Sequence, residues 1–269
     1  MSNKSFSRGE DLTLAFRLAD AADAITLARY QSQDLKISTK PDNTPVTDAD
    51  KSAEEAIRAL LGAHRPDDGI VGEEFGNEGV DHQRYWVIDP IDGTKNFLRG
   101  IPTWATLIGL VERQADGSQK TIVGVVSAPA LFRRWYAHNN GGAFVSVNRE
   151  TPRRIHVSNV SRLEDASISY SDFAGWGPML QPFQELMDSA WRTRGYGDFW
   201  SHMLVAEGAI EVAVEPSLAL WDMAALDVIV TEAGGVFSDT HGTKGPHGSN
   251  GVSTNAQLHQ LIITQLNKS

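Results

Sequence analysis

Two aspartates that follow a short apolar segment constrain this chain more than any other feature. The run Trp86-Val-Ile-Asp-Pro-Ile-Asp-Gly-Thr-Lys-Asn-Phe97 places Asp89 and Asp92 around a proline turn, with Gly93 and Thr94 directly behind them. Neighbouring carboxylates leave water only when something neutralises their charge, and oxygen ligands suit a hard cation such as Mg²⁺. If a helix begins here, the amides of Gly93 and Thr94 can face an anion. The run therefore predicts a site where a metal ion and a phosphate meet.

The composition is that of an ordinary soluble globular protein, with 269 residues of which 41% are hydrophobic and 22% charged. No segment approaches the roughly 20 apolar residues of a membrane span, and the first ten residues have no apolar signal core. We therefore expect a cytoplasmic protein without a membrane partner. The absence of cysteine excludes disulfides, thiolate metal sites and a cysteine nucleophile. The net charge of −10 argues against nucleic acid as a partner, whereas bound divalent cations would reverse the local field for a phosphate.

Hydrophobic periodicity predicts both helices and strands. Helices are expected over 11–30, from 48 through the apolar face ending near 61, and over 179–193, 199–207 and 222–233. Strands are expected at 70–72, 85–88, 105–111, 121–126, 135–137, 143–147, 155–157, 166–170 and 210–214. The stretch 36–48, with Pro41 and Pro45, is expected to be a loop. We predict two halves: residues 1–150 with an antiparallel sheet and most of the acids, and residues 151–269 with alternating strands and helices.

Three further segments place a carboxylate at the end of an expected element. They are Thr47-Asp48, Gly72-Glu73-Glu74 and Trp221-Asp222-Met-Ala-Ala225. The last two, in order and spacing with Asp89-Pro-Ile-Asp-Gly-Thr94, resemble the motifs of the inositol monophosphatase family, and the resemblance spans nearly the whole chain. It implies a layered αβαβα sandwich of the α/β (α+β) class, a homodimer, and Mg²⁺-dependent hydrolysis of a small phosphate monoester.

The same resemblance implies a set of metal ligands. Glu73, Asp89 and the backbone carbonyl of Ile91 would hold one Mg²⁺. Asp89, Asp92 and Asp222 would hold a second, and Glu73 would also touch a third, weaker site. Two metal ions can activate the attacking water and stabilise the leaving oxygen, so the protein mainly positions groups and neutralises charge. No side chain needs to become phosphorylated.

Other residues take catalytic and phosphate-binding roles through the resemblance. Thr94, hydrogen-bonded to Asp48, would orient the attacking water, while the amides of Gly93 and Thr94 would cradle the phosphate. Lys40 is a further candidate near the weaker metal site, and Glu74 is a candidate beside the metal ligands. For Asp48 a simple helix cap, and for Glu74 a surface position, remain alternatives.

The organic half of the substrate is indicated by a more local resemblance. Lys95, followed by Asn96-Phe97, and the segment 195–201 resemble the histidinol-phosphate phosphatase branch, in which Asp198 and Glu215 would line the substrate. Histidinol phosphate carries an ammonium and an imidazole, so acids facing it supply charge-assisted hydrogen bonds. Aromatic residues could add a wall for a ring or cation, although such a cluster more often belongs to the core. These are Phe173, Trp176, Tyr196, Phe199 and Trp200.

Several alternatives stay open at this point. Inositol monophosphate, a nucleotide-derived phosphate or a sugar bisphosphate could replace histidinol phosphate, and Lys95 could be a solvated surface residue. Asp198 and Glu215 could pair with arginines at 192 or 194 instead of substrate. A phosphatase of the haloacid dehalogenase type requires Asp-x-Asp, which the spacing here does not provide. A regulatory protein on the same fold is a non-enzymatic alternative, although the full set of acids argues against it.

Overall fold

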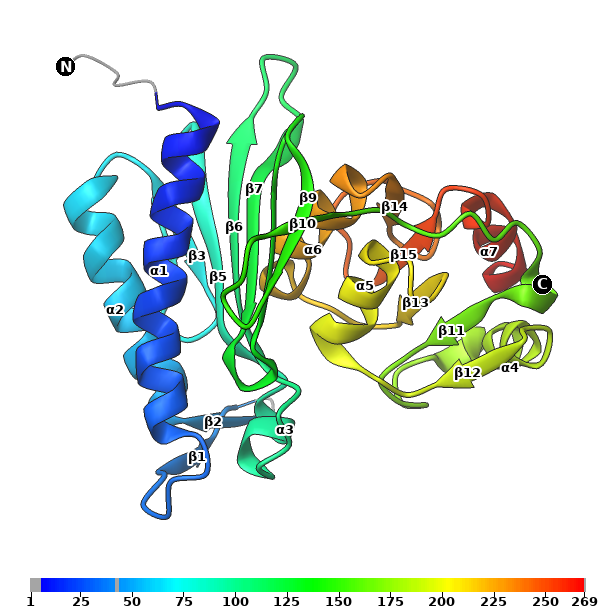
Figure 1. Ribbon diagram of the computed structural model, residues 1–269, viewed down its shortest axis with the longest axis horizontal. Helices are drawn as coiled ribbons and strands as arrows, with labels where there is room; N and C mark the ends of the chain where they lie inside the picture. Colours follow the sequence, from blue (N-terminus) through cyan, green and yellow to red (C-terminus); the bar gives the residue numbers. More distant parts are fainter. Residues whose placement is uncertain (1–5, 42–43, 269) are drawn as a thin grey trace.

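The protein is a sandwich of five alternating layers, as Figure 1 shows for this computed structural model, which describes residues 6–41 and 44–268. Helices α1 and α2 cover one face of an eight-stranded sheet, and α5 and α6 lie between that sheet and a five-stranded sheet. Helices α4 and α7 cover the far face of the smaller sheet. This arrangement confirms the predicted αβαβα sandwich. Within the described ranges, no helix combines the length and apolar character needed to cross a membrane.

The helices match most of the predicted segments. The α-helices are α1 Arg8–Arg29, α2 Asp48–His64, α3 Thr94–Leu98, α4 Leu180–Asp188, α5 Asp198–Ala206, α6 Leu220–Glu232 and α7 His259–Leu266. Short 3₁₀ helices are η1 Pro129–Leu131, η2 Leu163–Asp165 and η3 Gly177–Met179. The helix predicted over 179–193 was too long, because residues 192–194 form a strand whose backbone pairs with the smaller sheet. Helix α7 was not predicted.

The larger sheet carries the motif with two aspartates. In spatial order its strands are β10 Arg153–Ile155, β9 Gly142–Val147, β8 Arg133–His138, β7 Gln119–Ala128, β6 Ala105–Arg113, β5 Arg84–Asp92, β3 Gly69–Gly72 and β4 Gly76–Glu78. Neighbours are antiparallel except β3 and β5, so the predicted antiparallel sheet is present. The turns at 116–117 and 140–141 connect β6 to β7 and β8 to β9, as expected. Strand β10 begins after residue 150 but pairs with β9 of this sheet. The division of the chain at residue 150 stays a prediction.

The smaller sheet is mixed. Its strands in spatial order are β12 Arg192–Arg194, β11 Ser167–Ser169, β13 Val212–Glu215, β15 Gly251–Asn255 and β14 Gly235–Ser238. β12, β14 and β15 were not predicted. The loop expected over 36–48 was wrong in part, because β1 (Ile37–Thr39) pairs with β2 (Pro45–Thr47) in a separate two-stranded hairpin. Such pairing satisfies backbone groups that a loop would leave to water.

Close packing of α6 on the larger sheet sets the position of the site. The strands below the helix have glycine at two central positions, Gly109 on β6 and Gly124 on β7. A Cβ atom on Gly109 would lie 2.9 Å from the Cβ of Ala224, and one on Gly124 would lie 2.5 Å from Val228. Because these strands have no side chain there, α6 approaches their backbone closely. The first turn of α6, with Asp222, is thereby fixed above the end of β5.

Candidate functional site

Three aspartates from two elements meet between the layers. Asp89 and Asp92 lie at the end of β5, and Asp222 lies in the first turn of α6. Each contributes a carboxylate oxygen such that these oxygens all lie within 4.8 Å of one another. The sequence motifs had indicated these residues, and the structure brings them together.

A β-bulge explains how two acids three positions apart reach one place. Asp89 lies opposite Leu107 on β6, but Asp92 lies opposite Ala105, so β5 takes three steps where β6 takes two. A bulge re-aims side chains that regular alternation would distribute over opposite faces. The Ile91 amide donates to Asp89 Oδ1 at 2.9 Å and so holds the carboxylate inside the bulge.

The three carboxylates strongly disfavour being charged together. Burial raises the pKa of both Asp89 and Asp92, and the negative charges of neighbouring acids raise it further. Burial also raises the pKa of Asp222 to about 7. No lysine, arginine or histidine of the described chain forms an ion pair with any of the three. One buried and two half-buried carboxylates that lack a balancing cation in the described chain fit a hard divalent ion such as Mg²⁺.

Each of these aspartates is also held by a backbone amide, so its position is set before any ligand binds. The amide of Phe199, in the first turn of α5, donates to Asp92 Oδ2 at 2.8 Å. The amide of Ala219 donates to Asp222 Oδ2 at 2.7 Å, which caps α6. Acids are favoured in the first turn of a helix, so Asp222 stabilises α6 while facing the site.

Glu73 and Glu74 occupy the turn between β3 and β4, where Lys40 joins them. Lys40 Nζ lies 2.7 Å from Glu73 Oε1 and 2.6 Å from Glu74 Oε1. Burial alone would lower the pKa of Lys40, but the two carboxylates beside it raise the value. Burial raises the pKa of Glu74 to about 7. Glu73 adds to the negative field at Asp89, so this turn and the aspartates form one electrostatic unit.

The structure differs from the expected pairing of Thr94 with Asp48. Thr94 Oγ1 donates to the carbonyl of Ile91 at 3.0 Å, because the intervening turn brings this hydroxyl over the carbonyl three residues earlier. Asp48, the first residue of α2, instead accepts a hydrogen bond from Arg29 Nη2 at 2.9 Å. Its other oxygen, Oδ1, is buried and has no hydrogen-bond partner among the residues that the structure describes. The capping role at α2 belongs to Thr47, whose hydroxyl accepts from the amides of the first turn.

A pocket of about 440 Å³ adjoins the aspartates. Among its lining residues are Asp92, Lys95, Asp198, Glu215 and Asp222, so it contains the three charged side chains predicted to face the substrate, at 95, 198 and 215. The pocket is strongly acidic. Among the described residues that line it, Lys95 and His202 are the only basic ones.

Asp198 and Glu215 are linked by one serine. Ser171 Oγ donates to Glu215 Oε1 at 2.7 Å and accepts from the amide of Asp198 at 3.0 Å. Asp198 Oδ2 accepts a second hydrogen bond, at 2.9 Å, from the side-chain amide of Asn96. Burial raises the pKa of Asp198, and it raises the pKa of Glu215 to about 8. Neither acid pairs with an arginine in the described chain, so the alternative of salt bridges to residues 192 and 194 was wrong.

Sequence reasoning missed Ser171 and assigned no hydrogen-bonding role to Asn96, because their partners lie 27 to 102 positions away along the chain.

Gly93 separates the metal motif from α3. Its φ of +80° is one that residues with a side chain rarely adopt. A Cβ atom here would lie 2.9 Å from the carbonyl oxygen of Thr103 and 3.4 Å from Asp198 Oδ2. Glycine is therefore required both by the turn and by the space beside the pocket.

The predicted aromatic wall is largely absent. Of the five residues proposed for it, Phe199 alone lines the pocket within the described ranges. Trp176 is buried and stacks on Phe183 with ring centroids 3.6 Å apart, so it belongs to the core of the smaller sheet. The rings of Tyr196 and Trp200 pack against each other, with centroids 5.5 Å apart. Most of these aromatic residues therefore contact one another or the core and do not line the pocket.

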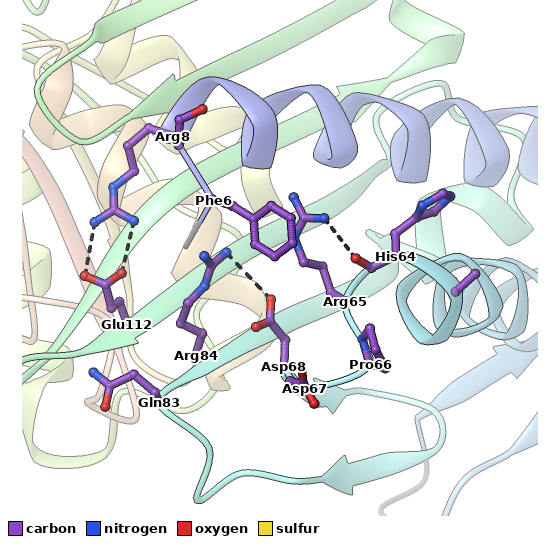
Figure 2. Close-up of a pocket in the computed structure, with 12 residues that line it drawn as sticks. Phe6, Arg8, His64, Arg65, Pro66, Asp67, Asp68, Gln83, Arg84 and Glu112 are labelled. Carbon is purple, nitrogen blue, oxygen red and sulfur yellow. Dashed lines mark hydrogen bonds and ion pairs between the residues drawn. The ribbon is translucent and has the colours of Figure 1, made fainter. Parts of the chain in front are cut away.

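A larger cavity, of about 920 Å³, lies at the opposite end of the large sheet and has a different character. Figure 2 shows its arginines engaged with protein partners: Arg8 with Glu112, Arg84 with Asp68, and Arg65 with the carbonyl of His64. Arg65 Nη2 also donates to Oδ1 of the buried Asp11 at 3.2 Å. Because its three arginines are already engaged with protein groups, this cavity differs from the acidic pocket, where Asp92 and Asp222 form no ion pair in the described chain.

Comparison with known proteins agrees with the fold and indicates the family. Residues 8–269 match the inositol monophosphatase family. The chain is 52% identical over 261 residues to the histidinol-phosphatase of Streptomyces coelicolor, covering 96% of this chain and 97% of that protein. It is 52% identical over 260 residues to the histidinol-phosphatase of Mycobacterium tuberculosis, covering 96% and 98%. The crystal structure of the extragenic suppressor protein suhB from Bartonella henselae has a TM-score of 0.84 at 30% identity, covering 97% and 99%.

The fold, the acids and these relatives define a phosphoric monoester hydrolase. The chain belongs to the inositol monophosphatase family.

Proposed function

We propose that this hydrolase cleaves L-histidinol phosphate to L-histidinol and phosphate. The observation that carries the proposal is a pair of acids, the half-buried Asp198 and the buried Glu215, which line the same pocket as Asp92 and Asp222. A substrate with an ammonium and an imidazole gives these acids a cationic partner, whereas the described lining residues of the pocket offer them only Lys95, which lies near Asp198. Inositol carries no charge for them to bind. The two relatives at 52% identity are named histidinol-phosphatases, which supports the same substrate here.

We propose Mg²⁺ as the cofactor, with two or three ions in the working site. Glu73, Asp89, the carbonyl of Ile91, Asp92 and Asp222 would hold them, since their donor atoms are all oxygens. Bound Mg²⁺ supplies Lewis-acid chemistry, because it activates water and neutralises negative charge on the phosphate.

The remaining work falls to residues around the phosphate. We propose that the amides of Gly93 and Thr94 donate to phosphate oxygens and that Lys95 adds positive charge at the pocket. Thr94 and Asp48 would orient the attacking water. In that role the Thr94 hydroxyl would give up its hydrogen bond to the Ile91 carbonyl and form one with the water. Asp48 Oδ1, which has no hydrogen-bond partner in the described chain, would offer an acceptor. Catalysis is then mainly positioning and charge neutralisation.

We also propose a homodimer that works in the cytoplasm, as the family resemblance and the absence of cysteine indicate. Sedimentation of the purified protein at several concentrations tests the dimer.

A panel of phosphate monoesters assayed with Mg²⁺ tests the substrate. One charge-assisted hydrogen bond contributes roughly 1.5–3 kcal/mol, so kcat/KM for histidinol phosphate should exceed that for inositol 1-phosphate by at least about tenfold. Equal values, or a preference for inositol 1-phosphate, would contradict the proposal.

A further inference from the structure

Glu54 is a buried acid on α2 that contacts the turn carrying Glu73 without reaching the pocket. Its side chain is fully buried, and its Oε2 accepts from the amide of Glu74 at 2.8 Å. Its Oε1 accepts from the amide of Phe75 at 3.3 Å and from Arg58 Nε at 2.8 Å. A carboxylate away from water needs such donors, and here two of them are backbone amides of the β3–β4 turn.

Arg58 completes this contact one helical turn later. Arg58 Nη2 donates to the carbonyl of Gly76, at the start of β4, at 2.5 Å. Residues four apart on a helix lie on the same face, so α2 presents Glu54 and Arg58 together. Glu54 accepts hydrogen bonds from two amides of the turn, and Arg58 donates one to the carbonyl that follows them, so both residues hold the backbone of the turn in place.

The backbone of β3 leaves space for this acid. A Cβ atom on Gly72 would lie 2.0 Å from Glu54 Oε1 and 2.6 Å from its Cδ, so an alanine at 72 would displace the carboxylate. Gly72 has an ordinary φ, which means that the glycine is required by the space and not by the backbone conformation. Glycine at 72 and glutamate at 54 are therefore a matched pair.

We propose that Glu54 is a positioning residue for metal binding: it fixes the Glu73–Glu74 turn so that the Glu73 carboxylate is held at the metal site. The proposal rests on the proposed use of Mg²⁺. Groups that orient metal ligands commonly contribute a factor of roughly 10–100 to metal affinity. Glu54 touches neither substrate nor metal, so its loss should raise the Mg²⁺ concentration required, with little change in kcat at saturating Mg²⁺.

Two variants and one control test this role. Glu54→Gln keeps the shape but replaces one accepting oxygen with an amide group that cannot accept. Gly72→Ala displaces the same carboxylate without changing it. Glu55→Gln, the exposed neighbour on α2, is the matched control. Calorimetric titration with Mg²⁺ alone should show binding about 10–100-fold weaker in both variants and unchanged in the control. The double variant should lose less free energy of Mg²⁺ binding than the sum of the losses in the two single variants, because both changes act on one contact.

Hydrogen exchange supplies a readout that needs no metal. In the wild type the Glu74 amide should be strongly protected, and in both variants this protection should fall selectively at 74–75. Rapid exchange of that amide in the wild type would overturn the proposal even if neither variant folded. Unchanged Mg²⁺ affinity in folded variants would also overturn it. A wild type that binds no Mg²⁺ would instead overturn the proposed cofactor, so the two failures are distinguishable.

Discussion

Replacing Glu215 by Gln should weaken catalysis selectively for a cationic substrate. Glu215 is 4% exposed, so the charge it offers to a ligand is poorly screened by water. A glutamine oxygen can still accept from the Ser171 hydroxyl, which now donates at 2.7 Å, so the local structure should persist. What is lost is a charged hydrogen bond, about 2 kcal/mol, which corresponds to about 30-fold in kcat/KM.

The assay compares two substrates in two variants. The kcat/KM of Glu215→Gln should fall about 30-fold for histidinol phosphate but only slightly for inositol 1-phosphate. Glu211→Gln is a matched control, since Glu211 is also buried, accepts from a backbone amide at 2.6 Å, and does not line the pocket. Equal losses on both substrates would refute the ion-pair reasoning.

The pH dependence gives a second test of the same residue. Burial raises the pKa of Glu215 to about 8, so below that pH the carboxyl must lose a proton to pair with a cation. Wild-type KM for histidinol phosphate should therefore fall as the pH rises toward about 8, relative to Glu215→Gln. The comparison cancels the substrate's own titration, and parallel profiles would count against an ionised Glu215 in the complex.

Three further predictions concern the metal motif and the charge of the site. Asp92→Asn should fold, because its oxygen can still accept from the Phe199 amide, but phosphatase activity should fall at least about 100-fold; an unchanged rate would favour a non-catalytic role. Gly93→Ala should lower both melting temperature and kcat, whereas Gly117→Ala, with a similar φ of +85° and open space around it, should cost about 1 kcal/mol of stability and leave kcat unchanged; equal effects would exclude the contact with Thr103. In EDTA the melting temperature should fall as the pH rises from about 5 to about 8, because the folded state keeps protons on acids whose pKa is raised and the unfolded state does not. Mg²⁺ should reverse this trend. A melting temperature that does not change with pH in EDTA would contradict the idea that these acids lack a balancing charge.

The acids proposed to bind the metal could be selected from the sequence because each lies in a local pattern. Asp89 and Asp92 follow an apolar strand, Glu73 follows another, and Asp222 opens a helix. Element ends are where side chains from distant segments converge, so the residue types and their order were sufficient to indicate the chemistry. Helical and strand periodicity likewise predicted most of the layers, since a buried face requires regular apolar spacing.

Contacts between distant segments were decided only by the tertiary structure. The bulge that aims Asp89 and Asp92 at one place depends on pairing between β5 and β6, and the partners of Thr94 and Asp48 depend on which groups compete for them. The sequence of 173–200 could not show which of its aromatic residues are buried, as Trp176 and Phe183 are, and which are exposed, as Phe173 is, because burial depends on neighbours that are remote in the chain. Local pattern determined which residues carry charge and where elements end, while packing determined which of those residues face the same space.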